Sequence, residues 1–207
     1  MSKPVIMIGN GGHASVLAEI LLTKGEEILG FTAPQEEKNL FSIPYLGADE
    51  SILNYSPKDI DLVLGLGMVR PSPIRQHLFN HFSSRDFQIK TVIHPSAIIA
   101  PSVQLGQGVQ IMAGVIIQTN TIIADNSIIN TGTLIDHDCQ IGAHVHIAPG
   151  VNISGQVHIQ NGTHIGTGAT IIQGMNIGTN CLIGAGAVVV KHIADNRKAV
   201  GVPAKEV

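Results

Sequence analysis

A repeat of six residues governs the second half of this chain. From residue 93 onward every sixth position carries an aliphatic side chain, and the frame does not slip over sixteen hexads. The positions are Ile93, Ile99, Leu105, Ile111, Ile117, Ile123, Ile129, Ile135, Ile141, Ile147, Ile153, Ile159, Ile165, Ile171, Ile177, Ile183 and Val189. A fixed short period is typical of a solenoid, in which each repeat packs only on its neighbours. The frame predicts a parallel β-helix in which three hexads complete one triangular coil.

Residues at other positions of the hexad fit such a coil. Asn126, Asn161 and Asn180 fall at expected corners, and Asn and Gly tolerate the positive φ that sharp corners require. Cys139 and Cys181 each lie four residues after a frame isoleucine, in a slot otherwise filled by small or β-branched residues. A free cysteine behaves as a small buried hydrophobe, so we expect both in the core.

The first part of the chain lacks this period and has the pattern of an α/β unit. Apolar runs at 5–8, 28–31 and 60–66 predict parallel strands, and a fourth run at 89–93 leads into the repeat. Apolar residues at helical spacing in 16–21 and 74–82 predict two helices. We therefore expect a small Rossmann-like domain over residues 1–88 and a β-helix domain with a short C-terminal tail over residues 89–207.

A glycine-rich turn follows the first predicted strand. Gly9, Gly11 and Ala14 match the dinucleotide-binding fingerprint, in which glycines let the backbone approach a pyrophosphate at a helix N-terminus. The acidic residue that usually completes this fingerprint is absent, because Thr32 and Ala33 occupy its place. A phosphate-bearing ligand is therefore favoured, but not NAD in particular. A tight turn that needs glycine only for its dihedral angles is the alternative.

Composition excludes several classes of function. The net charge is −3 and there is no basic block, which argues against a nucleic-acid surface. No apolar run approaches the ~20 residues of a membrane helix. The N-terminus leads straight into a predicted strand instead of a signal peptide, so we expect a cytoplasmic protein.

Histidines are the main polar departures from the frame. His137 lies between Asp136 and Asp138, and a carboxylate on one imidazole nitrogen orients the ring and raises the basicity of the other. His146 and His164 are eighteen residues apart, so we expect them to stack one coil apart at roughly 5 Å.

The repeat resembles the hexapeptide-repeat acyltransferases. The resemblance is carried by segments such as Leu105-Gly106-Gln107-Gly108-Val109 and Ile165-Gly166-Thr167-Gly168-Ala169. It implies that the β-helix is left-handed and that the protein is a homotrimer.

A narrower resemblance covers essentially the whole chain. The Gly-Asn-Gly-Gly-His turn at 9–13, Asn130-Thr131-Gly132, the Asp-His-Asp segment, His146 and the terminal Gly201-Val202-Pro203-Ala204-Lys205 are similar to the NeuD/PglD-type sugar acetyltransferases. This resemblance implies that the N-terminal domain binds a nucleotide sugar and that acetyl-CoA binds between neighbouring helices of the trimer. The implied acceptor is the amino group of a UDP-linked 4-amino-4,6-dideoxy sugar. A GDP-linked perosamine and a sialic acid hydroxyl remain alternatives.

The resemblance also assigns roles to individual residues. His137 corresponds to the catalytic base and Asp138 to the acid that supports it. The acetyl-CoA positions are His146, Gly155, Thr167 and Ala185. The nucleotide positions are Gly11, Gly12, His13 and Gly67, together with Thr32 and Ala33, where many relatives have a pair of aspartates. His13 alternatively caps the helix.

The expected mechanism is direct transfer. His137 would remove a proton from the sugar amine as it attacks the thioester, Asp138 would hold the imidazole, and a backbone N–H of the neighbouring coil would stabilise the oxyanion. No acyl-enzyme and no metal are expected. The alternatives are a sialic acid O-acetyltransferase, a γ-type zinc carbonic anhydrase and a non-enzymatic nucleotide-binding trimer. The carbonic anhydrase is less favoured, because the spacing of His137, His144 and His146 does not resemble that of its zinc ligands. An oxidoreductase is disfavoured because the ribose-binding acid is missing.

Overall fold

The computed structural model describes residues 3–207 and divides them into two compact units. One unit contains the residues up to Gly67 together with Pro73–Val92, and the other contains Met68–Ser72 and Ile93–Val207. This division by contacts falls after residue 92. The domain ranges 1–88 and 89–207 remain a prediction.

The first unit is built on a four-stranded parallel sheet with the order β2-β1-β3-β4. The strands are β1 (Val5–Ile8), β2 (Ile28–Thr32), β3 (Asp61–Leu64) and β4 (Gln88–Ile89). The strand predicted at 60–66 is shorter than expected and forms β3, which ends at Leu64. Its partner β1 ends at Ile8, and the last hydrogen bond between them runs from the Gly65 N–H to the Ile8 carbonyl at 2.7 Å.

The predicted strand at 89–93 is wrong as a single element. Residues 88–89 form β4 in the N-terminal sheet, and β5 (Val92–Ile93) already belongs to the repeat. The apolar run is continuous in sequence, so periodicity alone does not show where one sheet ends and the other begins.

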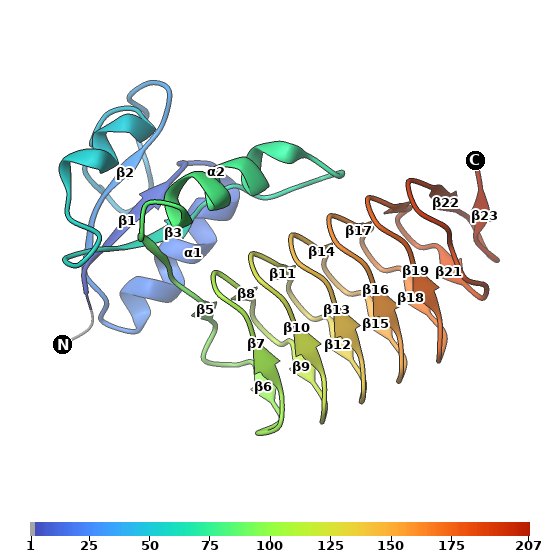
Figure 1. Cartoon of the computed structure of the whole chain (residues 1–207). Helices are drawn as coiled ribbons and strands as arrows, with labels where there is room; N and C mark the ends of the chain where they lie inside the picture. Colours follow the sequence, from blue (N-terminus) through green and yellow to red (C-terminus); the bar gives the residue numbers. More distant parts are fainter. Residues whose placement is uncertain (1–2) are drawn as a thin grey trace. The chain divides into compact units, whose positions relative to one another are not determined.

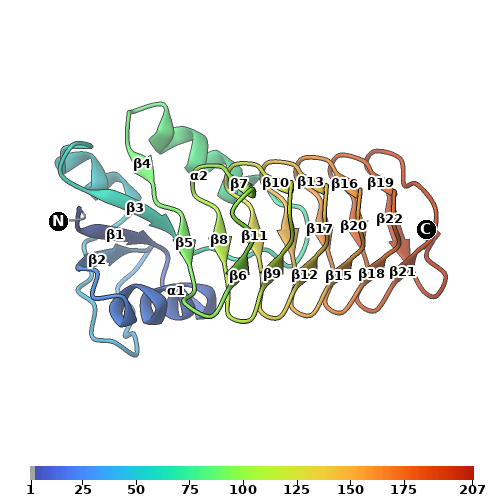
Figure 2. The same ribbon diagram turned by 90° about the horizontal axis from the view of Figure 1, so that it is seen from below.

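Two helices lie on opposite faces of this sheet, α1 (Gly12–Thr23) and α2 (Pro73–Ser83) (Figures 1 and 2). Ile6 and Ile8 of β1 pack in one buried cluster with Phe79 and Phe82 of α2. A short 3₁₀ helix, η1 (Asp49–Asn54), contacts β2. The α/β unit therefore matches the expected layers.

The second unit is a parallel β-helix with three sheets. One sheet contains β5, β8 (Gln110–Ile111), β11 (Ile128–Ile129), β14 (His146–Ile147), β17 (His164–Ile165), β20 (Leu182–Ile183), β22 (Lys198–Val200) and β23 (Lys205–Glu206). A second contains β6 (Ile98–Ile99), β9 (Ile116–Ile117), β12 (Leu134–Ile135), β15 (Asn152–Ile153), β18 (Thr170–Ile171) and β21 (Val188–Val189). The third contains β7 (Gln104–Leu105), β10 (Ile122–Ile123), β13 (Gln140–Ile141), β16 (His158–Ile159) and β19 (Asn176–Ile177).

Successive coils pair in register at a spacing of eighteen residues. Ile129 pairs with Ile147, and Ile147 pairs with Ile165. The frame residues from Ile111 to Val189 form one buried cluster, which also contains Cys139 and Cys181 with no exposed surface. The predicted coil and the core position of both cysteines are confirmed.

Asn126, Asn161 and Asn180 all lie in corner turns, as predicted. Asn126 and Asn180 have φ values of 58° and 54°. At the Asn161 corner the positive φ of 70° belongs to the next residue, Gly162, so the expected positive φ is wrong for Asn161 alone. The Asn161 side chain instead accepts a hydrogen bond from the Ala143 N–H of the preceding coil at 2.8 Å, and the adjacent glycine makes the turn.

Within residues 3–207 none of the helices has the combined length and apolar character needed to cross a membrane. The cytoplasmic location remains a prediction.

Candidate active site

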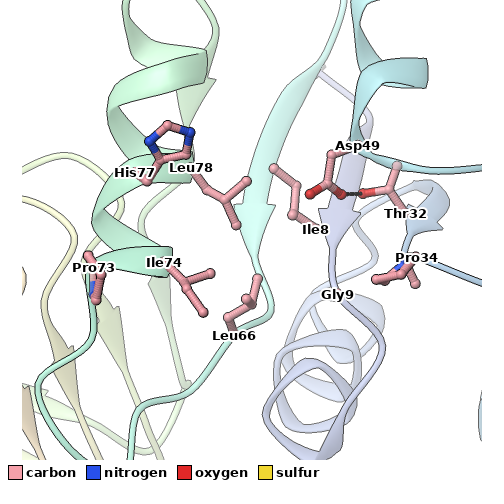
Figure 3. A pocket seen from close by; sticks show the side chains of 11 residues that line it. Ile8, Gly9, Thr32, Pro34, Asp49, Leu66, Pro73, Ile74, His77 and Leu78 are labelled. Atoms are coloured by element: carbon pink, nitrogen blue, oxygen red, sulfur yellow. Dashed lines mark hydrogen bonds between the residues drawn. The ribbon is translucent and has the colours of Figure 1, made fainter.

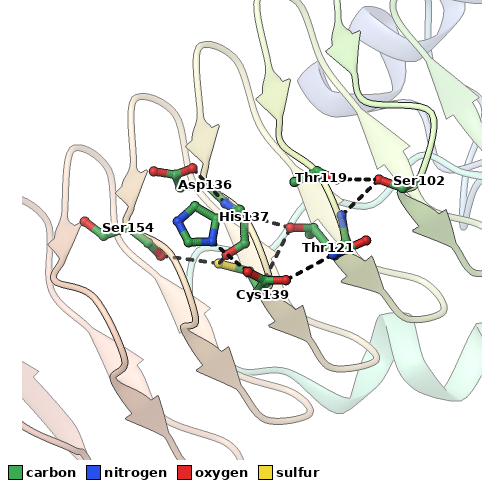
Figure 4. Close-up of polar contacts among 9 residues, drawn as sticks. Ser102, Thr119, Thr121, Asp136, His137, Cys139 and Ser154 are labelled. Carbon is green, nitrogen blue, oxygen red and sulfur yellow. Dashed lines mark hydrogen bonds and ion pairs between the residues drawn. The ribbon is translucent and has the colours of Figure 1, made fainter.

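The Asp-His-Asp segment forms the corner between β12 and β13, and the His137 imidazole projects outward from it (Figure 4). His137 Nδ1 lies 2.7 Å from Asp138 Oδ2. A carboxylate only accepts hydrogen bonds, so Nδ1 carries a proton, and in the neutral ring the lone pair is on Nε2. The side chains of His137 and Asp138 are about half exposed, at 43% and 45%. The pair is thus accessible from outside the β-helix.

Two neighbours fix this pair. Asp138 has φ of +59°, a corner conformation that brings consecutive side chains to the same side of the backbone, as an extended strand does not. Asn120, one coil earlier, donates to Asp138 Oδ1 at 3.3 Å. Asp136 Oδ1 accepts the backbone N–H of His137 at 2.8 Å. The Asp138 carboxylate is therefore held by His137 on one oxygen and by Asn120 on the other.

The electrostatics of the corner favour a stronger base. The pKa of His137 is raised above its ordinary value, chiefly by the hydrogen bond to Asp138, with additional attraction from the charges of Asp136 and Asp138. The same hydrogen bond lowers the pKa of Asp138, with a further contribution from Asn120. The pair is polarised as a general base requires.

Gly155 lies one coil beyond His137 and makes room for its ring. A Cβ at Gly155 would lie 2.7 Å from both His137 Nε2 and Cε1. The imidazole therefore rests against backbone that has no side chain. The structure brings Gly155 to the His137 corner, and Gly155 is not among the residues that line the cavity of His146, Thr167 and Ala185.

The cavity of His146, Thr167 and Ala185 lies in the same unit as the His137 corner and has a volume of about 410 Å³. His146, Thr167, Ala185 and His164 line it, and the role of the first three in binding acetyl-CoA stays a prediction. The rings of His146 and His164 are 5.0 Å apart, which confirms the predicted stack. His164 Nδ1 has no partner within residues 3–207, and burial lowers the pKa of the ring.

Both ring nitrogens of His146 have assigned partners. Nδ1 donates to the Met68 carbonyl, so Nε2 accepts from the Asn130 amide at 3.2 Å. Asn130 also lines the cavity, and its own Oδ1 accepts the Thr131 N–H at 2.8 Å. This chain of hydrogen bonds fixes the His146 ring at the cavity wall.

The glycine-rich turn of the first unit begins α1. Gly9 has φ of +96° and needs glycine for its dihedral angle. Gly11 and Gly12 have no positive φ, and a Cβ at either would meet nothing within 4 Å. Their missing side chains leave the start of α1 open, which favours ligand approach over the tight-turn alternative at these two positions. His13 lies within the first turn of α1, and Gly67 packs against its side chain.

Thr32 and Ala33 line another cavity, of about 490 Å³, in the same unit as the glycine turn (Figure 3). Gly9 also lines it, together with Leu66 and residues of α2. The carboxylate of Asp49 enters this cavity and accepts a hydrogen bond from the Thr32 hydroxyl at 2.6 Å. The end of β2, where Thr32 and Ala33 replace the usual acid in the sequence, is therefore next to the carboxylate of Asp49 in the fold.

The predicted site residues thus form three groups: the His137 corner with Asp138 and Gly155, the cavity of His146, Thr167 and Ala185, and the N-terminal turn and cavity. Sequence reasoning missed Asn120 and Asp49. The eighteen-residue spacing places Asn120 beside Asp138 and could have identified it. No periodic signal points to Asp49.

Residues 3–207 contain no cluster of three or more His, Cys, Asp or Glu side chains suited to a metal ion. The three histidines of the carbonic anhydrase alternative each have other partners: His137 pairs with Asp138, His144 with Asn126, and His146 with Asn130.

Two family models match the chain. The PglD N-terminal domain matches residues 4–82, and the bacterial transferase hexapeptide (six repeats) matches residues 102–137. No curated protein matches the sequence.

Several solved structures match the chain over its full length. The acetyltransferase domain of PglB from Neisseria gonorrhoeae is 33% identical with a TM-score of 0.93, and the match covers 100% of both chains. The same domain has been solved with acetyl coenzyme A. PerB from Caulobacter crescentus, in complex with CoA and GDP-perosamine, is 36% identical with a TM-score of 0.92, covering 100% of this chain and 98% of PerB. WeeI from Acinetobacter baumannii, at 22% identity and a TM-score of 0.89, shares the fold.

Proposed function

The chain belongs to the PglD-type sugar acetyltransferases of the hexapeptide-repeat superfamily, a family of acetyl-CoA-dependent acyltransferases with a left-handed β-helix, and on this premise we propose that it N-acetylates the amino group of a nucleotide-linked amino sugar. The ligands of its relatives support this class, since PerB was solved with CoA and GDP-perosamine and the PglB domain with acetyl coenzyme A. The PglD-type domain and its cavity would bind the nucleotide.

One observation carries the catalytic assignment: His137 Nδ1 lies 2.7 Å from Asp138 Oδ2, which favours the neutral tautomer with its lone pair on Nε2. The sugar amine attacks the thioester carbonyl, and Nε2 takes the proton that the nitrogen loses. The C–S bond then breaks and CoA leaves as the thiolate. Asp138 stabilises the imidazolium that forms. Direct transfer needs no nucleophilic side chain on the enzyme.

We further propose that the complete active site forms between copies of the chain. His137 lies at the corner between β12 and β13, whereas His146 lies on β14 and Thr167 and Ala185 follow β17 and β20. Within one helix the sheet that contains β12 and β15 separates these two regions. That sheet carries exposed apolar side chains, Ile98 and Leu134, at 63% and 42% exposure. A homotrimer that buries them would bring one copy's His137 to its neighbour's acetyl-CoA cavity.

The first experiment is a thiol-release assay with acetyl-CoA and a panel of UDP-, GDP- and dTDP-linked amino sugars, with free sialic acid included. Acetylation of sialic acid alone would contradict the proposal. His137→Ala should lower kcat by about 10²–10⁴-fold, because that is the range that general base catalysis contributes. Gln173→Ala, at the equivalent position two coils further along, should leave kcat unchanged. Near wild-type turnover in His137→Ala would remove this residue from the mechanism.

The second experiment tests the shared site. His137→Ala and His146→Ala proteins, each weakly active, are mixed, dissociated and reassembled. If the site forms between copies, mixed assemblies contain some sites with both wild-type residues, and activity rises above the sum of the two variants. Light scattering should give three times the chain mass of 21.8 kDa. Full activity in a monomeric species would contradict the trimer.

A further inference from the structure

The 490 Å³ cavity of the first unit has walls of almost entirely apolar character. Leu66 follows β3, Ile74 and Leu78 come from α2, and Pro34 follows β2. Figure 3 shows the Asp49 carboxylate and Thr32 toward one end of this cavity, and Gly9 and Leu66 toward the other. A single carboxylate in an apolar cavity is the arrangement that fixes the orientation of a small ligand.

The position of Asp49 is determined by the end of β2. Thr32, the last residue of β2, is fully buried, and its hydroxyl donates to Asp49 Oδ1 at 2.6 Å. The Ala33 N–H donates to the Gly47 carbonyl at 3.1 Å, which ties the segment before η1 to the same strand end. Within residues 3–207 no other side chain donates to Asp49, so Oδ2 retains its capacity to accept hydrogen bonds.

We propose that Asp49 hydrogen-bonds to the base of the bound nucleotide and selects guanine over uracil and thymine. This inference rests on the proposed function, in which the cavity holds the nucleoside of a nucleotide sugar. The open glycine turn that follows Gly9 is the phosphate site, so a nucleoside that extends from it into the cavity places its base at the end where Asp49 lies.

The chemistry of a carboxylate discriminates between the bases. It has two acceptor oxygens and no donor. Guanine presents two adjacent donors, N1–H and the N2 amino group, which match both oxygens. Uracil and thymine present a single N3–H flanked by two carbonyl oxygens, so one carboxylate oxygen would face another acceptor. An unmatched buried polar group costs about 1–3 kcal/mol, which corresponds to roughly 5- to 150-fold in affinity.

The apolar walls do not select between bases. Leu66 and Ile74 can contact the faces of any planar ring, and such contacts contribute affinity without reading the hydrogen-bonding edge. His77 of α2 also lines the cavity, on the wall across from Asp49, and Asp49 is the one carboxylate among the lining residues. A carboxylate is what the paired donors of guanine match, so we assign the selection to Asp49. The proposal replaces the uridine nucleotide that the sequence resemblance favours.

Isothermal titration of the full-length protein with GDP, UDP and dTDP tests this inference without acetyl-CoA or an amino sugar. GDP should bind at least tenfold more tightly than UDP or dTDP. Asp49→Asn should weaken GDP binding at least tenfold and change UDP binding less than threefold. Because the amide supplies a donor, the same variant should gain affinity for xanthosine diphosphate, whose C2 carbonyl replaces the guanine amino group. Glu50→Gln removes the same charge one residue away, outside the cavity, and should change none of these affinities.

Thr32→Val provides a second variant if Asp49→Asn is unstable in a thermal melt. It keeps the carboxylate but removes the hydroxyl that orients it, so GDP binding should weaken by about three- to tenfold while the preference for GDP persists. UDP binding equal to or tighter than GDP in the wild-type protein overturns the proposal, as does a GDP-to-UDP ratio unaffected by Asp49→Asn. No binding of any of the three nucleotides also overturns it.

These outcomes are separable from the failure of the proposed function. Acetylation of a UDP-linked amino sugar by a protein that does not prefer GDP leaves the acetyltransferase intact and removes the role of Asp49. Asp49-dependent GDP binding without acetylation of any nucleotide amino sugar leaves the nucleotide site intact and removes the acetyltransferase.

Discussion

The His137 imidazole rests against Gly155, the residue one coil further along the same corner, so closely that a Cβ there would lie 2.7 Å from Nε2. Gly155 has no positive φ, so alanine at this position creates no backbone strain. The steric conflict falls entirely on the imidazole. Gly155→Ala therefore tests whether catalysis requires the His137 ring in its observed position.

Gly155→Ala should displace the His137 ring from the hydrogen bond to Asp138 and lower kcat by about 10- to 100-fold, because small misplacements of a catalytic group are costly. The melting temperature should change little. Gln173→Ala, one coil further on, controls for a substitution at the same corner position. Unchanged kcat in Gly155→Ala would show that the ring does not act from this position.

The pH dependence of kcat should report the His137–Asp138 pair. A general base must be unprotonated, so the rate falls as the pH falls through the pKa of His137. Because Asp138 raises that pKa, the acidic limb of the wild-type profile should lie above the ordinary value of 6.5. Asp138→Asn removes the largest cause and should move the limb to lower pH while lowering the plateau rate.

Asp136→Asn is the matched comparison, since Asp136 acts on the His137 pKa only through its charge. Its limb should move in the same direction by a smaller amount. A wild-type limb below 6.5, or a limb that Asp138→Asn moves upward, would contradict the assignment of His137 as the base.

Cys139 should prove dispensable for catalysis although it lies beside the catalytic corner. Its thiol is fully buried and donates to the Ser154 carbonyl at 3.3 Å, and burial raises its pKa to about 11. A thiol of this kind is almost entirely protonated at neutral pH and is a poor nucleophile. Cys139→Ala should retain kcat within about threefold and lose about 1 kcal/mol of stability. Acetyl transfer to Cys139, detected by mass spectrometry of the rapidly quenched enzyme, would contradict direct transfer.

The six-residue frame predicted the β-helix because every coil repeats the same inward position. The frame alone places Ile147 over Ile129, Cys139 in the core and His146 over His164, and the structure has the same arrangement. The same eighteen-residue spacing places Gly155 over His137 and Asn120 beside Asp138. Relationships along the helix axis are therefore available from sequence wherever the frame holds.

Contacts outside the frame were not predictable in this way. Asp49 reaches Thr32 across seventeen residues of mostly irregular chain, and no period relates the two positions. The run at 89–93 joins two sheets without a break in its apolar pattern, so the division between β4 and β5 depends on tertiary pairing. The sequence indicated that an acid was missing after β2, but only the fold shows which residue supplies it.

Arg75 links two walls of the 490 Å³ cavity and should matter for the stability of the first unit. Its Nη1 donates to the Leu64 carbonyl at 2.8 Å and to the Leu66 carbonyl at 2.7 Å, so α2 is tied to the end of β3. The side chain is 2% exposed, and its Nε and Nη2 have no partner within residues 3–207. Burial lowers its pKa to about 9, which still leaves the guanidinium charged at neutral pH.

Arg75→Ala should lower the free energy of unfolding by about 3–5 kcal/mol, because it leaves a cavity and two carbonyls without their donor. Arg75→Met should cost only about 1–2 kcal/mol, since it fills the space and removes the buried, unpartnered N–H groups. Both should weaken nucleotide binding, because Leu66 and Ile74 lose their common anchor, but neither should change the preference among bases, which depends on Asp49. Urea unfolding and titration with nucleoside diphosphates measure the two effects, and Gln76→Met, an exposed neighbour on α2, serves as control. An Arg75→Met protein more stable than the wild type would show that the unpartnered charge costs more than its two hydrogen bonds contribute.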